Sequence, residues 1–242
     1  MKENLVFDFK RIFSGLILIS LLTTAYYFNL DNFIYVLLIF FSIYDLFYSK
    51  FLKINESIIY LIIFVLIIIA HSFTFNYFQY LFLIQFIFIL LMLFHKKKLN
   101  HYFFLSILIF LIMFIHIGKI DRNLFYQIFL IAFLNDSMAY LFGKFIKGPK
   151  IIPSISPNKT WSGTILSFFI TFGTLSVFGY NLFIAFLLSA SLFFGDIFFS
   201  YIKRKMKIKD FSNLINGHGG LLDRLDSMYL FVIFFQLTIL FN

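Results

Sequence analysis

Long apolar runs, separated by short polar connections, make up most of this chain. A helix needs about 20 residues to cross a hydrocarbon core of about 30 Å, and most of the runs approach or reach that length. A strand of a membrane barrel would instead alternate apolar and polar residues over about ten positions. Residues 58–70 are apolar without such alternation, so the pattern predicts helices. The expected helices lie at residues 12–28, 33–48, 57–75, 77–94, 102–118, 123–143, 161–180, 181–202 and 227–241.

The composition supports a membrane protein. Hydrophobic residues make up 62% of the 242 residues and charged residues only 13%, which is too little polar surface for a water-soluble globule of this size. We therefore expect an all-α, polytopic integral membrane bundle with about nine transmembrane helices. The 41 phenylalanines are expected to face lipid rather than to enclose a ligand. Because the chain has no cysteine, a metal site would use oxygen or imidazole ligands, which favours hard cations.

The distribution of lysine and arginine predicts the orientation in the membrane. These residues precede the first expected helix and follow the second, fourth, sixth and eighth, whereas the connections at 29–32, 75–77 and 179–181 carry none. This positive-inside pattern predicts a cytoplasmic N-terminus, and the turn at 119–122 is a mild exception. The pattern also accounts for the net charge of +9, so no nucleic-acid partner is expected.

No linker, repeat or low-complexity tract divides the chain, which predicts one membrane domain over residues 1–242 with two regions. Residues 1–118 form an N-terminal helical region, and residues 119–242 form a C-terminal catalytic region. The one acid and the two histidines that lie within the expected helices of the first region are expected to be interfacial or helix-bridging residues rather than functional ones. These residues are Asp45, His71 and His116.

Two polar segments open the C-terminal region. Asp136 lies about seven residues before the end of its apolar run, where an ionised carboxylate needs a partner or water. In the loop at 151–163, Ser156, Lys159 and Thr160 offer hydroxyl and ammonium donors just before a helix start, an arrangement that suits a phosphate. Ion pairing of Asp136 to a nearby lysine, and ordinary capping by the loop, are the alternatives.

A third polar segment, residues 195–226, carries three carboxylates that can share one cation. Asp223 and Asp226 are three residues apart, so on a helix they share one face and can hold a cation between them. Asp196 can join them from the end of the preceding helix. The pattern is typical of a Mg²⁺ site completed by water and substrate phosphate, with Asp136 as a further candidate ligand.

Cations and glycines surround these acids. Glycine lets the backbone approach a phosphate closely, and lysine and arginine neutralise its charge. A solvated loop on the cytoplasmic side would explain the cations but not the carboxylates and glycines beside them. His218, between two glycines, is a candidate phosphate donor, and Asp210 is a further catalytic candidate. The candidate phosphate contacts here are Lys203, Arg204, Lys209, Gly219, Gly220 and Arg224.

The stretch at 200–227 resembles the signature of the phosphatidate cytidylyltransferases, also called CDP-diacylglycerol synthases. The loop at 156–161 resembles the same family's Ser-Pro-x-Lys-Thr segment, and residues 136–140 with Gly143 resemble its preceding helix. The likeness covers roughly the C-terminal half. The signature residues are Ser200, Lys203, Arg204, Lys209, Asp210, His218, Gly219, Gly220, Asp223, Arg224 and Asp226.

Three positions depart from the family pattern. Asn216 stands where the family usually has proline, and Phe199 and Ser162 stand where glutamate is common. The loss of the two carboxylates puts their ordering role in doubt and leaves the aspartates to hold metal. An inactive paralogue with a scaffolding role is therefore an alternative.

The resemblance implies condensation of CTP with phosphatidic acid to CDP-diacylglycerol and pyrophosphate. It implies Mg²⁺, is compatible with a second cation and a homodimer, and points to the cytoplasmic face of a bacterial inner membrane. A phosphate monoester, with a second pKa of about 6, is already mostly ionised and needs no strong general base. It needs relief from charge repulsion, which a metal and a cationic loop supply.

Two further functions remain open. A CTP-dependent polyprenol or lipid kinase would transfer the terminal phosphate instead of the nucleotidyl group. A membrane transporter would spread its acids along several broken helices, whereas here they gather near one cytoplasmic edge.

Overall fold

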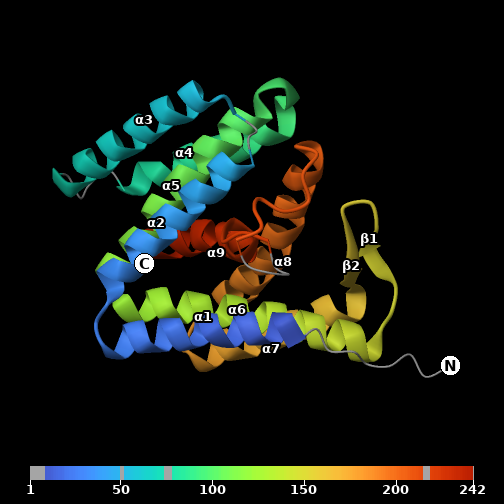
Figure 1. Ribbon diagram of the computed structural model, residues 1–242. Coiled ribbons are helices and arrows are strands. Elements are labelled where there is room, and N and C mark those ends of the chain that lie inside the picture. Colours follow the sequence, from blue (N-terminus) through green and yellow to red (C-terminus); the bar gives the residue numbers. More distant parts are fainter. Residues whose placement is uncertain (1–8, 50–51, 74–77, 215–218, 242) are drawn as a thin grey trace.

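The computed structural model describes residues 9–49, 52–73, 78–214 and 219–241, and helices dominate these ranges (Figure 1). Each of the predicted apolar runs forms one helix, so the predicted all-α fold class is confirmed. The helices are α1 (Phe9–Tyr27), α2 (Asp31–Tyr48), α3 (Ile54–Phe73), α4 (Phe78–Phe94), α5 (Leu99–Ile120), α6 (Arg122–Ile146), α7 (Trp161–Val177), α8 (Leu182–Lys205) and α9 (Leu222–Phe241). A 3-10 turn, Lys96–Lys98, precedes α5.

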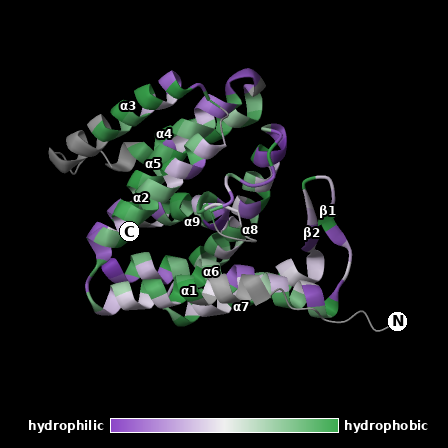
Figure 2. Ribbon diagram, viewed as in Figure 1, coloured by the Kyte–Doolittle hydropathy of each residue, from purple (hydrophilic) through white to green (hydrophobic). Residues whose placement is uncertain are grey.

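Four of the helices in the described ranges, α2, α5, α6 and α8, are long and apolar enough to cross a membrane. Large apolar side chains also lie exposed on the outer helices, such as Ile62 (56%) on α3 and Phe86 (50%) on α4. Figure 2 shows the hydrophobic residues spread along these helices, where water would make such exposure unfavourable. The chain is therefore a polytopic membrane protein.

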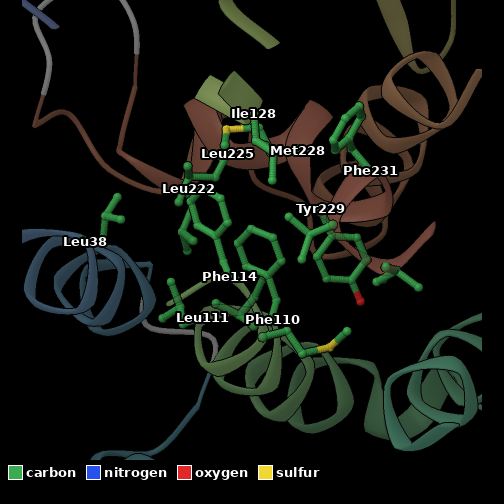
Figure 3. Packing of buried hydrophobic residues seen from close by; sticks show 14 of the residues in the cluster. Leu38, Phe110, Leu111, Phe114, Ile128, Leu222, Leu225, Met228, Tyr229 and Phe231 are labelled. Atoms are coloured by element: carbon green, nitrogen blue, oxygen red, sulfur yellow. The ribbon is translucent and has the colours of Figure 1, made fainter. Parts of the chain in front are cut away.

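Helix α5 is the centre of the fold. The other helices bury 78% of its most apolar window, compared with 28–39% for the other three long helices. Its aromatic side chains meet α9 and α6, and Figure 3 shows this packing at close range. The labelled residues are Leu38 of α2, Phe110, Leu111 and Phe114 of α5, Ile128 of α6, and Leu222, Leu225, Met228, Tyr229 and Phe231 of α9.

One segment is not helical. The strands β1 (Lys150–Ile152) and β2 (Ser156–Thr160) form a small antiparallel hairpin between α6 and α7. Its register pairs Lys150 with Thr160 and Ile152 with Ser156. The sequence predicted an extended loop here, and the hairpin adds backbone pairing that fixes where Lys159 and Thr160 lie. Thr160 then caps α7, because its side chain accepts a hydrogen bond from the Gly163 amide.

The charged turn between α5 and α6 is paired across the fold. The Arg122 Nε atom donates to Asp31 Oδ1 at 2.9 Å, and the Tyr126 hydroxyl donates to the same oxygen at 2.7 Å. The Arg122 guanidinium also lies over the Tyr26 ring, 4.6 Å from its centroid. The α5–α6 turn and the α1–α2 connection therefore lie at the same end of the bundle.

Replacing Phe114 by alanine should destabilise the protein. Phe114 is fully buried, and its ring centroid lies 4.7 Å from that of Phe125. We expect a loss of up to about 3 kcal/mol in unfolding free energy. This value is the low end of the range for buried phenylalanine in soluble proteins, because in a membrane protein the substitution removes mainly van der Waals packing. Phe94→Ala is the control, since Phe94 is 76% exposed on α4. Unfolding in detergent measures both, and equal stability would contradict the central place of α5.

Candidate active site

The polar segments of the C-terminal region meet at one cavity with a volume of about 2120 Å³. Its wall is charged where α6, α8, α9 and the hairpin meet, and apolar where α1, α2 and the middle of α6 line it. Most of the predicted site residues line this cavity. They are Asp136, Ser156, Lys159, Thr160, Asp196, Lys203, Lys209, Asp210, Gly219, Asp223, Arg224 and Asp226.

Two predicted phosphate contacts, Arg204 and Gly220, do not line the cavity. Arg204 donates to the backbone carbonyl of Ile155 in the hairpin and to that of Ile208, each at 3.2 Å. It therefore ties the hairpin to the end of α8, and its phosphate contact stays a prediction. His218 and Asn216 lie outside the described residues.

Asp223 holds the connection between α8 and α9 in place. Its Oδ1 atom accepts a hydrogen bond from Lys203 Nζ at 2.8 Å, and its Oδ2 atom accepts from the backbone amides of Phe211 (2.9 Å) and Gly220 (2.8 Å). Charge-assisted bonds of this kind are strong, and they occupy both oxygens. Asp223 therefore organises the site from within the protein, a role that spacing alone does not predict.

Two lysines neutralise the carboxylates of the cavity. Buried Lys203 bridges two of them, because its Nζ atom also lies 3.8 Å from Asp226 Oδ2. Lys159 of β2 forms an ion pair with Asp196 of α8. Burial lowers the pKa of Lys159 below its ordinary value, and the charges of Asp226 and Asp136 oppose that shift. The ion pair of Lys159 that the structure shows is with Asp196, and ion pairing of Asp136 to a lysine stays an alternative.

Three helices bring carboxylates to these lysines. Asp136 on α6 and Asp226 on α9 interact electrostatically. Asp196 follows Gly195, where α8 and α9 are in close contact: a Cβ atom at Gly195 would lie 2.8 Å from the Ser227 carbonyl oxygen. Glycine permits this close approach of the two helices. Asp196, the next residue of α8, therefore lies where α8 contacts α9, the helix that carries Asp226.

The donor set can be compared with what Mg²⁺ requires. In the described ranges, no group of three acidic or histidine side chains lies close enough together to hold a metal ion. Mg²⁺, however, is usually held by one or two carboxylates together with substrate phosphates and water. Asp136, Asp196 and Asp226 all line the cavity, so a pair of them is the candidate for that smaller requirement, whereas Asp223 already has protein donors on both oxygens.

The departure at Phe199 is accommodated by aromatic packing. Phe199 is fully buried, with ring centroids 5.4 Å from Phe103 and 5.1 Å from Tyr229. Phe211 stacks on Phe103 with centroids 5.3 Å apart, and its amide is one of the donors to Asp223. An apolar cluster thus supports the α8–α9 connection at the position where a carboxylate is common. At the other departure, the Ser162 hydroxyl donates to the Lys147 carbonyl and joins α7 to the end of α6.

Sequence reasoning missed one residue of this region, Asp45 on α2. Its carboxylate is fully buried and accepts hydrogen bonds from the Ser212 hydroxyl and the Leu222 amide. The helix-bridging interpretation was right, but the bridge leads to the candidate site. The available signal was an acid inside an apolar run, near the end of that run. His116 is buried, and the side chain of His71 lies outside the described part.

The comparisons with known proteins identify the family of the chain. The model of the cytidylyltransferase family matches residues 9–241, so the chain belongs to that family. Three relatives carry the name phosphatidate cytidylyltransferase. The one from Rickettsia bellii is 40% identical over 118 residues, covering 42% of this chain and 51% of the relative. The one from Helicobacter pylori is 39% identical over 110 residues, covering 42% and 41%. The one from Staphylococcus aureus is 39% identical over 115 residues, covering 43% and 44%.

The chain spans about half the length of the curated relatives it matches. The matched part of this chain is also less than half of its residues. The activity, substrates and partners of the whole protein are therefore argued below as proposals.

Replacing Gly195 by alanine should force α8 and α9 apart. We expect a loss of about 1–3 kcal/mol in unfolding free energy, as for other overpacked positions. Gly173→Ala on α7 is the matched control, since a Cβ atom there meets nothing within 4 Å. That variant should be as stable as the parent or slightly more so, because alanine favours helix. If both variants unfold at the parent's temperature in detergent, the close α8–α9 contact is contradicted.

Proposed function

We propose that this protein is a Mg²⁺-dependent nucleotidyltransferase that condenses CTP with phosphatidic acid to CDP-diacylglycerol and pyrophosphate. The observation that carries the proposal is the double character of the cavity. One part of its wall alternates lysines with carboxylates, and the other part is apolar and built from α1, α2 and α6. Such a wall suits a polyanionic nucleotide together with a lipid whose phosphate lies at the charged part.

In the proposed reaction, a phosphate oxygen of phosphatidic acid forms a bond to the α-phosphorus of CTP. The bond from that phosphorus to the oxygen bridging toward the β-phosphate breaks, and pyrophosphate leaves. The attacking phosphate is already mostly ionised at neutral pH, so the site needs no strong base. The main requirement is to hold two polyanions together, which positioned cations achieve.

The ion pairs suggest how the residues share this work. Lys159 and Lys203 lie against carboxylates, and each can turn its ammonium group toward an incoming phosphate. Asp196 and Asp226, with Asp136 beside them, would then hold Mg²⁺, which supplies positive charge and alignment to the transferring phosphate when bound. Asp223 keeps Lys203 and the α8–α9 connection in place.

The orientation predicted from charge is part of the proposal: nine membrane helices, a cytoplasmic N-terminus and a site at the cytoplasmic face of a bacterial inner membrane. Contacts at both ends support it. Arg204 joins the connections after α6 and α8, which are the lysine-rich ones. At the other end Asp31 neutralises Arg122. The turn at residues 119–122, which is the exception to the positive-inside pattern, therefore carries little net charge. Burial, and after it the charge of Asp121, raises the pKa of Tyr180, which supports a position of the α7–α8 connection near that same turn.

The reaction is tested with purified protein in detergent, phosphatidic acid, Mg²⁺ and labelled CTP. We expect labelled CDP-diacylglycerol and release of pyrophosphate. Lipid phosphorylation with release of CDP would identify a lipid kinase instead and would refute the proposal. Omitting Mg²⁺ or adding a chelator should abolish product formation, because the lysines alone do not replace a divalent ion at the transferring phosphate.

Asp226→Asn should lower this activity at least about 100-fold, the scale seen when one stabilising group is removed from a reaction centre. The fold should persist, since asparagine has the same shape and leaves Lys203 its contact with Asp223. Asp121→Asn is the matched control, because it makes the same change at the far end of α6, where asparagine also caps a helix well. Asp226→Asn with parental activity would contradict the metal assignment.

A further inference from the structure

Asp45 connects the N-terminal region to the candidate site by two hydrogen bonds. Its Oδ1 atom accepts from the Ser212 hydroxyl at 2.6 Å, and its Oδ2 atom accepts from the Leu222 amide at 2.8 Å. Ser212 lies in the connection between α8 and α9, and Leu222 is the first residue of α9. One carboxylate of α2 therefore holds both the connection and the helix start that follows it.

Gly220 shows how closely Asp45 approaches this connection. A Cβ atom at Gly220 would lie 2.2 Å from Asp45 Oδ2 and 2.5 Å from its Cγ atom, which no side chain could occupy. The sequence explained this glycine by close approach to a phosphate. The structure gives a different reason, since the Asp45 carboxylate lies where the side chain would be.

A second carboxylate holds the same connection from the cavity side. Asp223 accepts hydrogen bonds from the amides of Phe211 and Gly220, next to the two groups that Asp45 contacts. The described part of the connection is thus fixed between two acids, one from each region of the chain. A buried carboxylate is costly in an apolar helix unless donors satisfy it, and here the connection supplies them.

We propose that Asp45 is a positioning residue that sets the conformation of the α8–α9 connection and thereby the places of Asp223 and Lys203. Its effect on catalysis rests on the proposed function, whereas its effect on the connection does not. The N-terminal helices then serve the reaction directly instead of only anchoring the chain in the membrane.

Amide hydrogen exchange of ligand-free protein in detergent tests the structural part. In Asp45→Ala, peptides covering residues 209–214 and 219–222 should exchange about tenfold faster or more, since a hydrogen bond to a charged acceptor is lost. Ser42→Ala is the matched control: Ser42 is buried on the same helix, and its hydroxyl has no hydrogen-bond partner among the described residues. It should exchange as the parent does. Unchanged exchange in Asp45→Ala would overturn the proposal.

Ser212→Ala gives the same test from the other side of the contact, in case Asp45→Ala does not fold. It should speed exchange at Leu222 without any change on α2. Leu214 is left out of this comparison, because its amide donates to the Ser212 hydroxyl and loses that bond whether or not Asp45 is involved. In the Asp45→Ala/Ser212→Ala double variant, the free-energy change measured by exchange should be smaller than the sum of the changes in the two single variants. The reason is that each single variant already removes the bond between Ser212 and Asp45. Additive effects would overturn the Asp45–Ser212 coupling.

The catalytic part is read from the split between KM and kcat in Asp45→Asn. A displaced connection should raise the KM for CTP at least about fivefold while the KM for phosphatidic acid changes less, because Lys203 and Asp223 line the charged part of the cavity and CTP carries more negative charge than phosphatidic acid. A purely structural role would reduce only the amount of active protein and leave both KM values unchanged, which would overturn the catalytic part. If the parent protein shows no transferase activity while exchange responds as expected, the proposed function fails and the positioning of the connection stands.

Discussion

The structure depends on the pairing of buried charges where α6, α8, α9 and the β1–β2 hairpin meet. Carboxylates in an apolar bundle are stable only when cations or amide donors satisfy them, and Lys203 and Lys159 supply the cations. The geometry that satisfies the acids without substrate is the same geometry that can receive phosphate and metal. Pairing therefore accounts both for the local fold and for the chemistry proposed for the cavity.

The α8–α9 connection shows how the two regions of the chain cooperate. Asp223 holds it from the cavity side and Asp45 from α2, while the stack of Phe103 on Phe211 supports it from α5. The N-terminal helical region and the C-terminal catalytic region that the sequence suggested therefore meet at this connection. The central helix α5 and its neighbour α2 fix the frame in which the signature residues lie.

The sequence predicted the helices well, because apolar length is a local property and each run is delimited by its own polar neighbours. It also identified most of the charged residues that line the cavity, since ionisable residues are rare in such a chain. It did not predict the hydrogen-bond and ion-pair partners of each acid. Asp223 and Asp226 have similar surroundings in the sequence, yet Asp223 accepts hydrogen bonds from Lys203 at one oxygen and from the Phe211 and Gly220 amides at the other. It also did not predict that Arg204 holds the hairpin, because that contact joins residues about fifty positions apart.

By itself, the sequence determined the helical class, the membrane setting, the family resemblance and the set of residues capable of phosphate chemistry, all of which follow from residue type and near spacing. Only the tertiary structure decided which charges pair, why Gly220 has no side chain, and that Asp45 belongs to the site. The physical reason is that hydrogen bonds and ion pairs act over a few ångströms. Partners such as Asp45 and Leu222 become neighbours only when the whole bundle has packed.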